Sequence, residues 1–329
     1  MDEVRVGFIG CGTHASMNLY PSLRFTPARL VAVADLHAER RDRIARAYNV
    51  ERVYDDYVKL LKAEQDLDAV LVSGPPKLHY AAAVAAMERG LHVFCEKPPA
   101  EDLAQAEEML AVSERTGRIC MVGFMKRFAQ KYAMAKEIAG REEFGRPTHL
   151  LLRYSFKTGG HRRGFLAGMG SHAFDLARHF MGDFRRVHAL WGDPAQGVTL
   201  TLSIEFASGA TGVVVMSSLA SAVVERLELT GEGAMVVVDD VATLEYYPRV
   251  ETVWQPAVKE VRRPNMALQT PENSSLCLQG YAGEVRAFIE AVQSGTPPAV
   301  ATIADGVAMM RIVELLSGGE SGSFEVQTA

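Results

Sequence analysis

Lys97 and His172 have side chains suited to proton chemistry on a hydroxyl group, and both follow local patterns that would expose them to a ligand. Lys97 comes two residues after the apolar run 91–95, in Glu96-Lys97-Pro98, where an ammonium group can bind a substrate oxygen and stabilise negative charge on it. His172 follows Ser171, a suitable N-cap, so the pattern predicts a histidine at the start of a helix. The positive end of a helix dipole disfavours an imidazolium, and a general base requires neutral imidazole. Taken alone, each residue is more simply explained by a structural role, Lys97 in a charged loop and His172 at a helix start.

The residues around Gly10 predict a dinucleotide site. An apolar run, 4–9, leads into Gly10, Gly12 and Ala15 at G-x-G-x-x-A spacing, and a helical pattern follows. Gly10 allows the tight turn, Gly12 lets a pyrophosphate approach the backbone, and Ala15 allows close packing of helix and strand. Asp35 ends the next apolar run, where a carboxylate can accept hydrogen bonds from an adenosine ribose. The alternative is a tight strand-to-helix turn with a surface aspartate.

Asp35 also bears on the choice between NAD and NADP. A carboxylate repels a 2′-phosphate and favours NAD, whereas Arg40 and Arg41, slightly later in the chain, could attract one. The two arginines also read as the exposed face of a helix. The sequence therefore predicts NAD, with NADP as the alternative.

Alternating strand and helix patterns in the first 123 residues would position these groups. Repeated alternation predicts an α/β fold, a doubly wound parallel sheet whose ligands bind beyond the carboxyl ends of the strands. The strands are expected at 4–9, 30–34, 53–54, 68–73, 91–95 and 119–122, and the helices at 14–25, 37–48, 55–62, 77–89 and 102–116.

The pattern changes after Gly123. Residues 198–206 alternate strictly between apolar and polar, as in a strand with one buried face. We predict a dinucleotide-binding Rossmann domain over 1–123 and, over 124–329, an α+β substrate-binding and oligomerisation domain with a large, mostly antiparallel open-faced sheet. Its strands are expected at 148–156, 187–191, 198–206, 211–217, 225–230, 235–238 and 243–246, its helices at 171–181, 280–294 and 303–316, and a loop at 248–275. A partner subunit or solvent would cover the polar face.

Composition excludes several classes of function. The 329 residues are 48% hydrophobic and 23% charged, as in globular proteins, and the net charge of −5 argues against a nucleic-acid partner. Neither a signal peptide nor a run of transmembrane length is evident, so we expect no membrane partner and a cytoplasmic location. The four cysteines lack metal-site spacing, so we expect no metal, and the three in the first half of the chain, Cys11, Cys95 and Cys120, are expected to be buried thiols.

Several motifs come in the order found in one family, and the chain resembles the glucose-fructose oxidoreductase / inositol dehydrogenase / rhizopine-catabolism (Gfo/Idh/MocA) family over essentially its whole length. The motifs are Gly10–Ala15, Asp35, Ser73–Pro76 with His79, Glu96-Lys97-Pro98, Gly123-Phe124, Gly170-Ser171-His172 with Asp175, the 280–298 segment and Ala304-Asp305-Gly306. The resemblance implies an NAD(P)-dependent enzyme that transfers a hydride between nicotinamide and a hydroxyl or keto carbon of a sugar, cyclitol or related substrate. It also implies a homodimer or homotetramer formed through the C-terminal sheet.

Carried over by position, the resemblance makes Lys97 the ligand of the reacting hydroxyl and His172 the acid/base. The expected cofactor-binding residues are Gly10, Gly12, Thr13, His14, Ala15, Asp35, Ser73, Pro75, His79, Glu96 and Lys97. The expected substrate-binding residues are Lys97, Arg127, Tyr154, His161, Arg162, Arg163 and Asp175.

One departure from the family pattern bears on the substrate. Many members carry an aspartate four residues before the histidine, where this chain has Gly168. Asp175, one helical turn past His172, is a weak substitute. Gly168 and Gly170 would leave room for a bulkier substrate, and His161, Arg162 and Arg163 could bind an anionic substituent. Two other functions stay open: a redox-neutral enzyme that retains its NAD, glycosidase-like or self-recycling, and a non-catalytic dinucleotide-responsive regulator.

Overall fold

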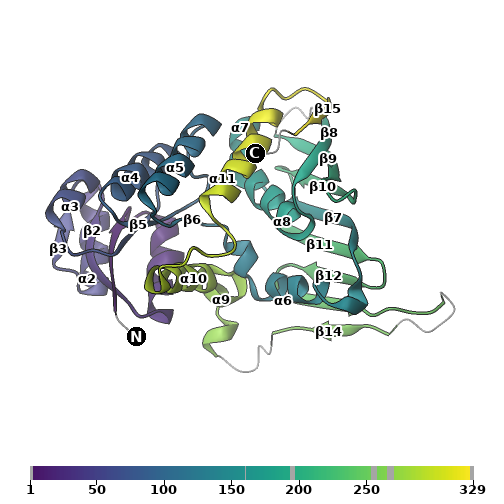
Figure 1. Cartoon of the computed structure of the whole chain (residues 1–329), viewed down its shortest axis with the longest axis horizontal. Coiled ribbons are helices and arrows are strands. Elements are labelled where there is room, and N and C mark those ends of the chain that lie inside the picture. The colour runs from purple at the N-terminus through teal and green to yellow at the C-terminus, as the bar shows by residue number, and fades with distance from the viewer. Residues whose placement is uncertain (1–2, 160, 193–196, 253–257, 265–269, 327–329) are drawn as a thin grey trace. The chain divides into compact units, whose positions relative to one another are not determined.

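A computed structural model describes residues 3–159, 161–192, 197–252, 258–264 and 270–326 (Figure 1). The chain forms two compact units. The first contains Met1–Met125 and Tyr281–Met310, and the second contains Lys126–Gly280 and Arg311–Ala329. The division of functions between residues 1–123 and 124–329 stays a prediction.

The first unit is built on a six-stranded sheet whose strands all run parallel, in the order β3-β2-β1-β4-β5-β6. The strands are β1 (Val4–Ile9), β2 (Ala28–Ala34), β3 (Arg52–Tyr54), β4 (Ala69–Val72), β5 (His92–Cys95) and β6 (Cys120–Val122). All four residues of β4 are buried, as expected for a central strand covered on both faces. The strand order reverses beside β1, which places a ligand crevice at the carboxyl ends of β1 and β4.

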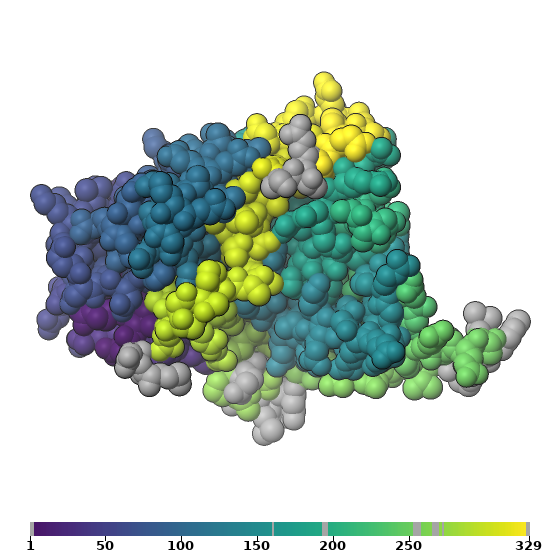
Figure 2. Space-filling model, viewed as in Figure 1, coloured from purple at the N-terminus to yellow at the C-terminus, as the bar shows by residue number. Residues whose placement is uncertain are grey.

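Helices cover this sheet as predicted. They are α1 (Tyr20–Ser22), which follows a π-helical segment Ala15–Leu19, α2 (Ala38–Tyr48), α3 (Tyr57–Ala63), α4 (Pro76–Glu88), α5 (Leu103–Thr116) and α10 (Tyr281–Ser294). Figure 2 shows the solvent side of α4 and α5 in blue. Helix α10 comes from the part of the chain that was predicted to form the second domain. Its Phe288 ring lies 5.8 Å from the Phe94 ring of β5. The fold class predicted for the first part of the chain is confirmed.

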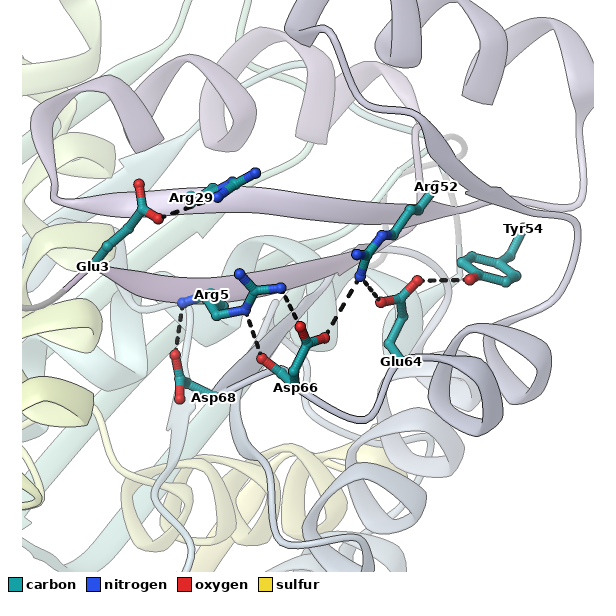
Figure 3. A network of polar contacts seen from close by, with 8 residues as sticks. All are labelled: Glu3, Arg5, Arg29, Arg52, Tyr54, Glu64, Asp66 and Asp68. Carbon is teal, nitrogen blue, oxygen red and sulfur yellow. Dashed lines mark hydrogen bonds and ion pairs between the residues drawn. The ribbon is translucent and has the colours of Figure 1, made fainter.

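Hydrogen bonds and ion pairs connect the amino ends of strands of this sheet (Figure 3). The backbone N–H of Arg5, in β1, donates to Asp68 just before β4 at 2.7 Å, and its guanidinium binds Asp66. Arg52 of the edge strand β3 binds Glu64 at 2.6 Å and approaches Asp66 at 3.5 Å. These contacts join the edge strand and the segment before β4 to β1, while the carboxyl ends of the strands stay available for a ligand.

The second unit is built on a nine-stranded sheet of order β14-β13-β12-β11-β7-β10-β9-β8-β15. Only β7 and β10 pair in parallel among its described strands. The bounds are β7 (Pro147–Ser155), β8 (Phe184–Gly192), β9 (Thr199–Phe206), β10 (Thr211–Ser217), β11 (Val224–Gly231), β12 (Met235–Asp239), β13 (Thr243–Tyr247), β14 (Glu260–Arg262) and β15 (Gly322–Glu325). The large, mostly antiparallel sheet is confirmed.

One face of this sheet is buried because apolar side chains alternate in register across the strands. Leu227 of β11 pairs with Leu152 of β7 and Val238 of β12, and all three are fully buried. Helices α6 (Gln130–Ala139) and α8 (Ser171–Met181) contact this sheet, α6 at β12 and β13 and α8 at β7 and β10 (Figure 1). On the other face, Leu190 is 58% exposed. The open face predicted from the alternation is therefore present.

Several elements differ from the expectation. The segment 248–275, predicted to be a loop, contains β14, and α9 (Ser275–Gln279) follows directly. Helix α6 and a 3₁₀ turn, Met125–Phe128, also went unpredicted. Helix α11 (Ile303–Ser317) forms as expected. In the described part of the chain, no helix has both the length and the apolar content to cross a membrane.

A buried ion pair stabilises the second unit. Lys126 Nζ lies 2.7 Å from Glu225 Oε2 and donates to Gln279 Oε1 at 3.0 Å, while the Tyr132 hydroxyl donates to the other oxygen of Glu225 at 2.9 Å. Lys126 and Glu225 are each only 3% exposed. Every charge of this cluster thus has a partner in a region that water does not reach.

Removal of one partner should therefore be costly. We expect Lys126→Met to lower the free energy of unfolding by about 3–5 kcal/mol, because the Glu225 carboxylate would stay buried without its counter-charge. Chemical denaturation followed by circular dichroism measures the loss. The control is Arg146→Met in the exposed Arg146–Glu232 pair, which should leave the unfolding free energy nearly unchanged. Equal effects of the two substitutions would contradict this interpretation.

Candidate active site

The glycine turn after β1 has the geometry that a dinucleotide needs. Gly10 has φ of +103°, and a Cβ there would overlap the carbonyl oxygen of Ser73, so only glycine fits. A Cβ at Gly12 would meet no atom within 4 Å, so its backbone faces open space. Ala15 is fully buried against the sheet. The residues present therefore fit a pyrophosphate beside Gly12, with Thr13 and His14 following in the same turn.

Asp35 is held at the edge of this turn by backbone groups. Its Oδ2 accepts from the Cys11 N–H at 2.7 Å, and its Oδ1 accepts from the His37 N–H at 2.8 Å. Arg41 donates to the carbonyl oxygen of Asp35 at 3.1 Å, and Arg43 donates to that of Cys11 at 3.4 Å. The carboxylate predicted to meet the adenosine ribose is thus fixed in place, and two guanidinium groups bond to the carbonyl oxygens of Asp35 and Cys11.

His79 joins two loops at the carboxyl edge of the sheet. Its Nε2 accepts from the Gly74 N–H at 2.9 Å, and its Nδ1 lies 2.8 Å from the Pro98 carbonyl oxygen, to which it donates. Burial lowers the pKa of His79, which is 1% exposed, so the ring stays neutral and serves one loop as acceptor and the other as donor. Both ring nitrogens are occupied by the protein. His79 therefore positions Ser73–Pro75 and Lys97-Pro98.

Glu96 is the charged centre of this edge. Its Oε1 lies 2.9 Å from His14 Nε2, and its Oε2 accepts from the Lys97 N–H at 3.1 Å. A Cβ at Gly123 would lie 3.0 Å from the Glu96 carboxyl carbon, so the strand β6 side of the carboxyl is closely packed. Burial alone would raise the pKa of Glu96, but the hydrogen bond and charge of His14, with Lys97, lower it overall. Lys97 thus leaves β5 beside a buried carboxylate.

A carboxyl group that sequence reasoning missed lies in the same unit. Glu284 of α10 is fully buried, and neither of its carboxyl oxygens has a hydrogen-bond partner among the described residues. Burial raises its pKa well above the usual range, and the negative charge of Glu96 adds to the effect while Lys97 opposes it. The shift favours the neutral carboxyl group. The available signal was a glutamate on the apolar stripe of the helix, between Tyr281 and Phe288.

In the second unit, His172 lies inside a helix and not at its start. Helical backbone continues from α7 (Arg162–Phe165) through a π-helical segment, Leu166–Gly170, into α8. The Ser171 hydroxyl donates to the Gly168 carbonyl oxygen at 3.0 Å, as in a helix interior, so Ser171 is not an N-cap. The predicted effect of a helix dipole on His172 is therefore wrong. His172 is 8% exposed, and its ring lies 5.7 Å from the Tyr154 ring of β7.

Arg127 and Asp175 bind each other. Arg127 Nε and Nη2 donate to the Asp175 carboxylate at 2.7 to 3.1 Å, and both side chains are almost fully buried. Asp175 therefore has a guanidinium partner that sequence reasoning did not foresee, because the two residues are 48 positions apart. This ion pair ties the segment after β6 to α8, the helix that carries His172.

The arginines predicted to bind an anion also have partners. Arg162 donates to the Gly319 carbonyl oxygen at 2.6 Å and lies over the Trp191 ring, and Arg163 lies 2.9 Å from Glu314. Both hold α7 against the end of α11. His161, just before α7, is exposed.

The two glycines of the π-helical segment differ. A Cβ at Gly168 would meet no atom within 4 Å, which agrees with the predicted space there. A Cβ at Gly170 would lie 2.9 Å from the Phe174 ring, so Phe174 fills that space. The expectation that both glycines leave room for a substrate is wrong for Gly170. Among the described residues, no group of three or more His, Cys, Asp or Glu side chains is arranged to hold a metal ion.

Comparisons with known proteins agree with this arrangement. Residues 4–124 match the family described as "Oxidoreductase family, NAD-binding Rossmann fold", and residues 132–237 match the "GFO/IDH/MocA C-terminal domain". The chain belongs to the Gfo/Idh/MocA family. The resemblance, the fold class and the prediction of an NAD-binding oxidoreductase are thereby confirmed.

Members of the Gfo/Idh/MocA family similar to this chain include dehydrogenases of cyclitols and sugars. The myo-inositol 2-dehydrogenase of Thermotoga maritima is 27% identical over 320 residues, which cover 90% of each chain. A dehydrogenase from Chromobacterium violaceum has a TM-score of 0.89 at 25% identity, covering 97% of this chain and 96% of that one. Levoglucosan dehydrogenase in complex with NADH has a TM-score of 0.86 at 21% identity, covering all of both chains, and shows the shared fold.

The geometry at Asp35 leads to a prediction about cofactor choice. We expect this member of the family to bind NADH more tightly than NADPH, because the fixed carboxylate repels a 2′-phosphate. Asp35→Asn should reduce the preference about tenfold or more, since a charge-assisted hydrogen bond is lost and the repulsion disappears. Fluorescence titration gives both dissociation constants. Glu88→Gln, on α4 in an exposed ion pair with Arg115, is the control and should change neither. Tighter NADPH binding by the unaltered protein would overturn the prediction.

Proposed function

We propose that this protein is an NAD-dependent dehydrogenase that oxidises a hydroxyl group of a neutral polyol, a cyclitol or sugar, and reduces the corresponding ketone in reverse. The observation that carries the proposal is the setting of Lys97. It is the second residue after β5, and it follows Glu96, which bonds to His14, and precedes Pro98, whose carbonyl oxygen bonds to His79. It therefore lies at the edge where a Rossmann sheet binds the second half of a dinucleotide.

In this proposal the residues of the glycine turn, with Asp35, Ser73, Pro75 and Glu96, hold the cofactor. When bound, NAD supplies two-electron chemistry as a hydride acceptor. Lys97 donates a hydrogen bond to the reacting hydroxyl and stabilises negative charge on its oxygen as the C–H bond breaks. His172 accepts the hydroxyl proton as general base, so that a carbonyl forms, and returns it in the reverse direction. Residues 1–123 would thus serve the cofactor and 124–329 the substrate.

The preference for a neutral substrate comes from the arginines. Arg127 is paired with Asp175, Arg163 with Glu314, and Arg162 donates to a carbonyl and lies over Trp191. A substrate anion would have to compete with these partners. The names of the relatives, myo-inositol 2-dehydrogenase and levoglucosan dehydrogenase, also support uncharged polyols. Lys97 and Tyr154, whose ring lies beside His172, are the substrate contacts that we retain from the expected set.

We also propose that a second copy of the chain covers the open face of the nine-stranded sheet. Leu151 of β7 and Leu190 of β8, both on that face, are 37% and 58% exposed, and the partly exposed Val213 and Val215 of β10 lie between these strands. Polar residues of β9, among them Thr201 and Ser203, lie between these strands on the same face, and a flat face with both apolar and polar residues is suited to a symmetric interface.

A substrate screen tests the activity. Sugars, cyclitols and uronic acids would be tested with NAD and NADP, and their keto forms with NADH, by the absorbance of reduced nicotinamide. We expect turnover of at least one neutral polyol with NAD. Turnover confined to uronic acids would contradict the preference for neutral substrates. Tight cofactor retention without net NADH formation would contradict the dehydrogenase itself.

Substitutions at the two catalytic positions test the mechanism. We expect His172→Ala to lower kcat by about 10²- to 10⁴-fold, the usual contribution of a general base. Lys97→Met should lower kcat/KM by a similar order, because a charge that stabilises the reacting oxygen is lost. His179→Gln, two turns along α8 from His172, is the matched control and should keep full activity. Full kcat in His172→Ala would eliminate its role as acid/base.

A further inference from the structure

His14 links two parts of the first unit that are distant in sequence. It follows Gly12 by two residues, in the turn whose backbone faces open space, and its ring bonds to Glu96 at the end of β5 at 2.9 Å. The Asn18 amide nitrogen lies 3.3 Å from Nδ1, so Nε2 is the nitrogen that donates to Glu96. The His14 side chain is 43% exposed, whereas that of Glu96 is 7% exposed. His14 can therefore exchange protons with solvent while it contacts a buried carboxylate.

Few charged groups face the His14–Glu96 pair among the described residues, so a further charge nearby would affect it strongly. Lys97 is the second cation near Glu96, and its N–H also bonds to the carboxylate. His79, on α4, has both ring nitrogens engaged and stays neutral. From α10, Tyr281 places its ring edge-on to His14, at 5.6 Å, and Glu284 contributes a neutral carboxyl. Among these groups, His14 is the imidazole whose side chain is in contact with solvent, since His79 is buried.

We propose that His14 takes up a proton when the cofactor binds and so couples the pyrophosphate-binding turn to the segment that carries Lys97. The inference rests on the NAD-binding part of the proposed function. The two negative charges of a pyrophosphate beside Gly12 favour the imidazolium form of His14. The proton comes from solvent, and no bond to the cofactor forms. The imidazolium strengthens the contact with Glu96, so cofactor binding fixes the residue that precedes Lys97.

The sign of the pH effect follows from this coupling. Because the bound state holds more protons than the free state, affinity for the cofactor is highest at low pH and falls as pH rises through the range in which the bound-state imidazolium loses its proton. One linked proton limits the change to about tenfold in Kd per pH unit. The same charge acts whether the nicotinamide is present or not, so adenosine diphosphate ribose should behave as NADH does.

Isothermal titration calorimetry in buffers of different ionisation enthalpy counts the protons directly. The titrants are NADH, adenosine diphosphate ribose, which keeps the pyrophosphate, and adenosine monophosphate, which has none. The proteins are the unaltered chain, His14→Gln, His14→Asn and the control His92→Gln. His92 lies at the opposite end of β5 from Glu96, where it accepts from the Ile119 N–H. Circular dichroism confirms that each variant is folded.

We expect the unaltered protein and His92→Gln to take up a fraction of one proton with NADH and with adenosine diphosphate ribose, and close to none with adenosine monophosphate. Both His14 variants should bind NADH with no proton uptake and with a flatter pH dependence of Kd. Equal uptake in the His14 variants, or uptake with NADH but not with adenosine diphosphate ribose, would overturn the proposal. Absence of uptake in an unaltered protein that binds NADH and turns over a polyol would overturn it too, and would leave the dehydrogenase function standing. If the unaltered protein failed to bind NADH, both would fall.

Discussion

A charged carboxylate, Glu96, is buried at the end of β5, and the carboxyl edge of the parallel sheet is arranged around it. Isolated in an apolar interior, such a group would lose its charge, because desolvation of a carboxylate costs more than folding can supply. Here the imidazole of His14, the backbone N–H of Lys97 and the Lys97 charge keep it ionised. Gly123 has no side chain, so the neighbouring strand end can come close to the carboxyl group. The glycine turn, β5 and β6 thus depend on one another through a single side chain.

The same edge contains two further ionisable groups, His79 and Glu284, whose surroundings favour their uncharged forms. Burial lowers the pKa of His79, whose ring bonds to two loops, and burial together with the charge of Glu96 raises the pKa of Glu284. Both shifts favour the neutral forms, so the charges described at this edge are mainly those of Glu96 and the groups that bond to it or lie near it, His14 and Lys97. A small number of charges in a region of low dielectric responds strongly to any further charge, including that of a bound phosphate.

Most strands and helices could be predicted from the sequence, because local residue patterns determine them. Val4–Ile9 and Thr211–Ser217 form strands over the predicted residues, since apolar periodicity and flanking turn residues agree there. The helix through Gly168 and Gly170 could not be predicted, because glycine disfavours helix and here the Arg162 and Arg163 contacts and Phe174 packing prevail. The Arg127–Asp175 and His14–Glu96 pairs join residues far apart in sequence, which no local pattern reports. For the site, residue types were therefore predictable, whereas their partners were not.

The π-helical segment before His172 lets the chain hold an extra residue without changing the direction of this side chain. In a regular α-helix, one additional residue would rotate everything that follows by about 100° around the helix axis. A π turn accommodates one residue more than an α turn, so the segment Leu166–Gly170 absorbs an extra residue between the anchored α7 and α8. The direction of the residue at position 172 is thereby separated from the length of the segment before it. A change of one residue in that segment can be taken up within a single turn, with α8 and the sheet that it contacts unchanged.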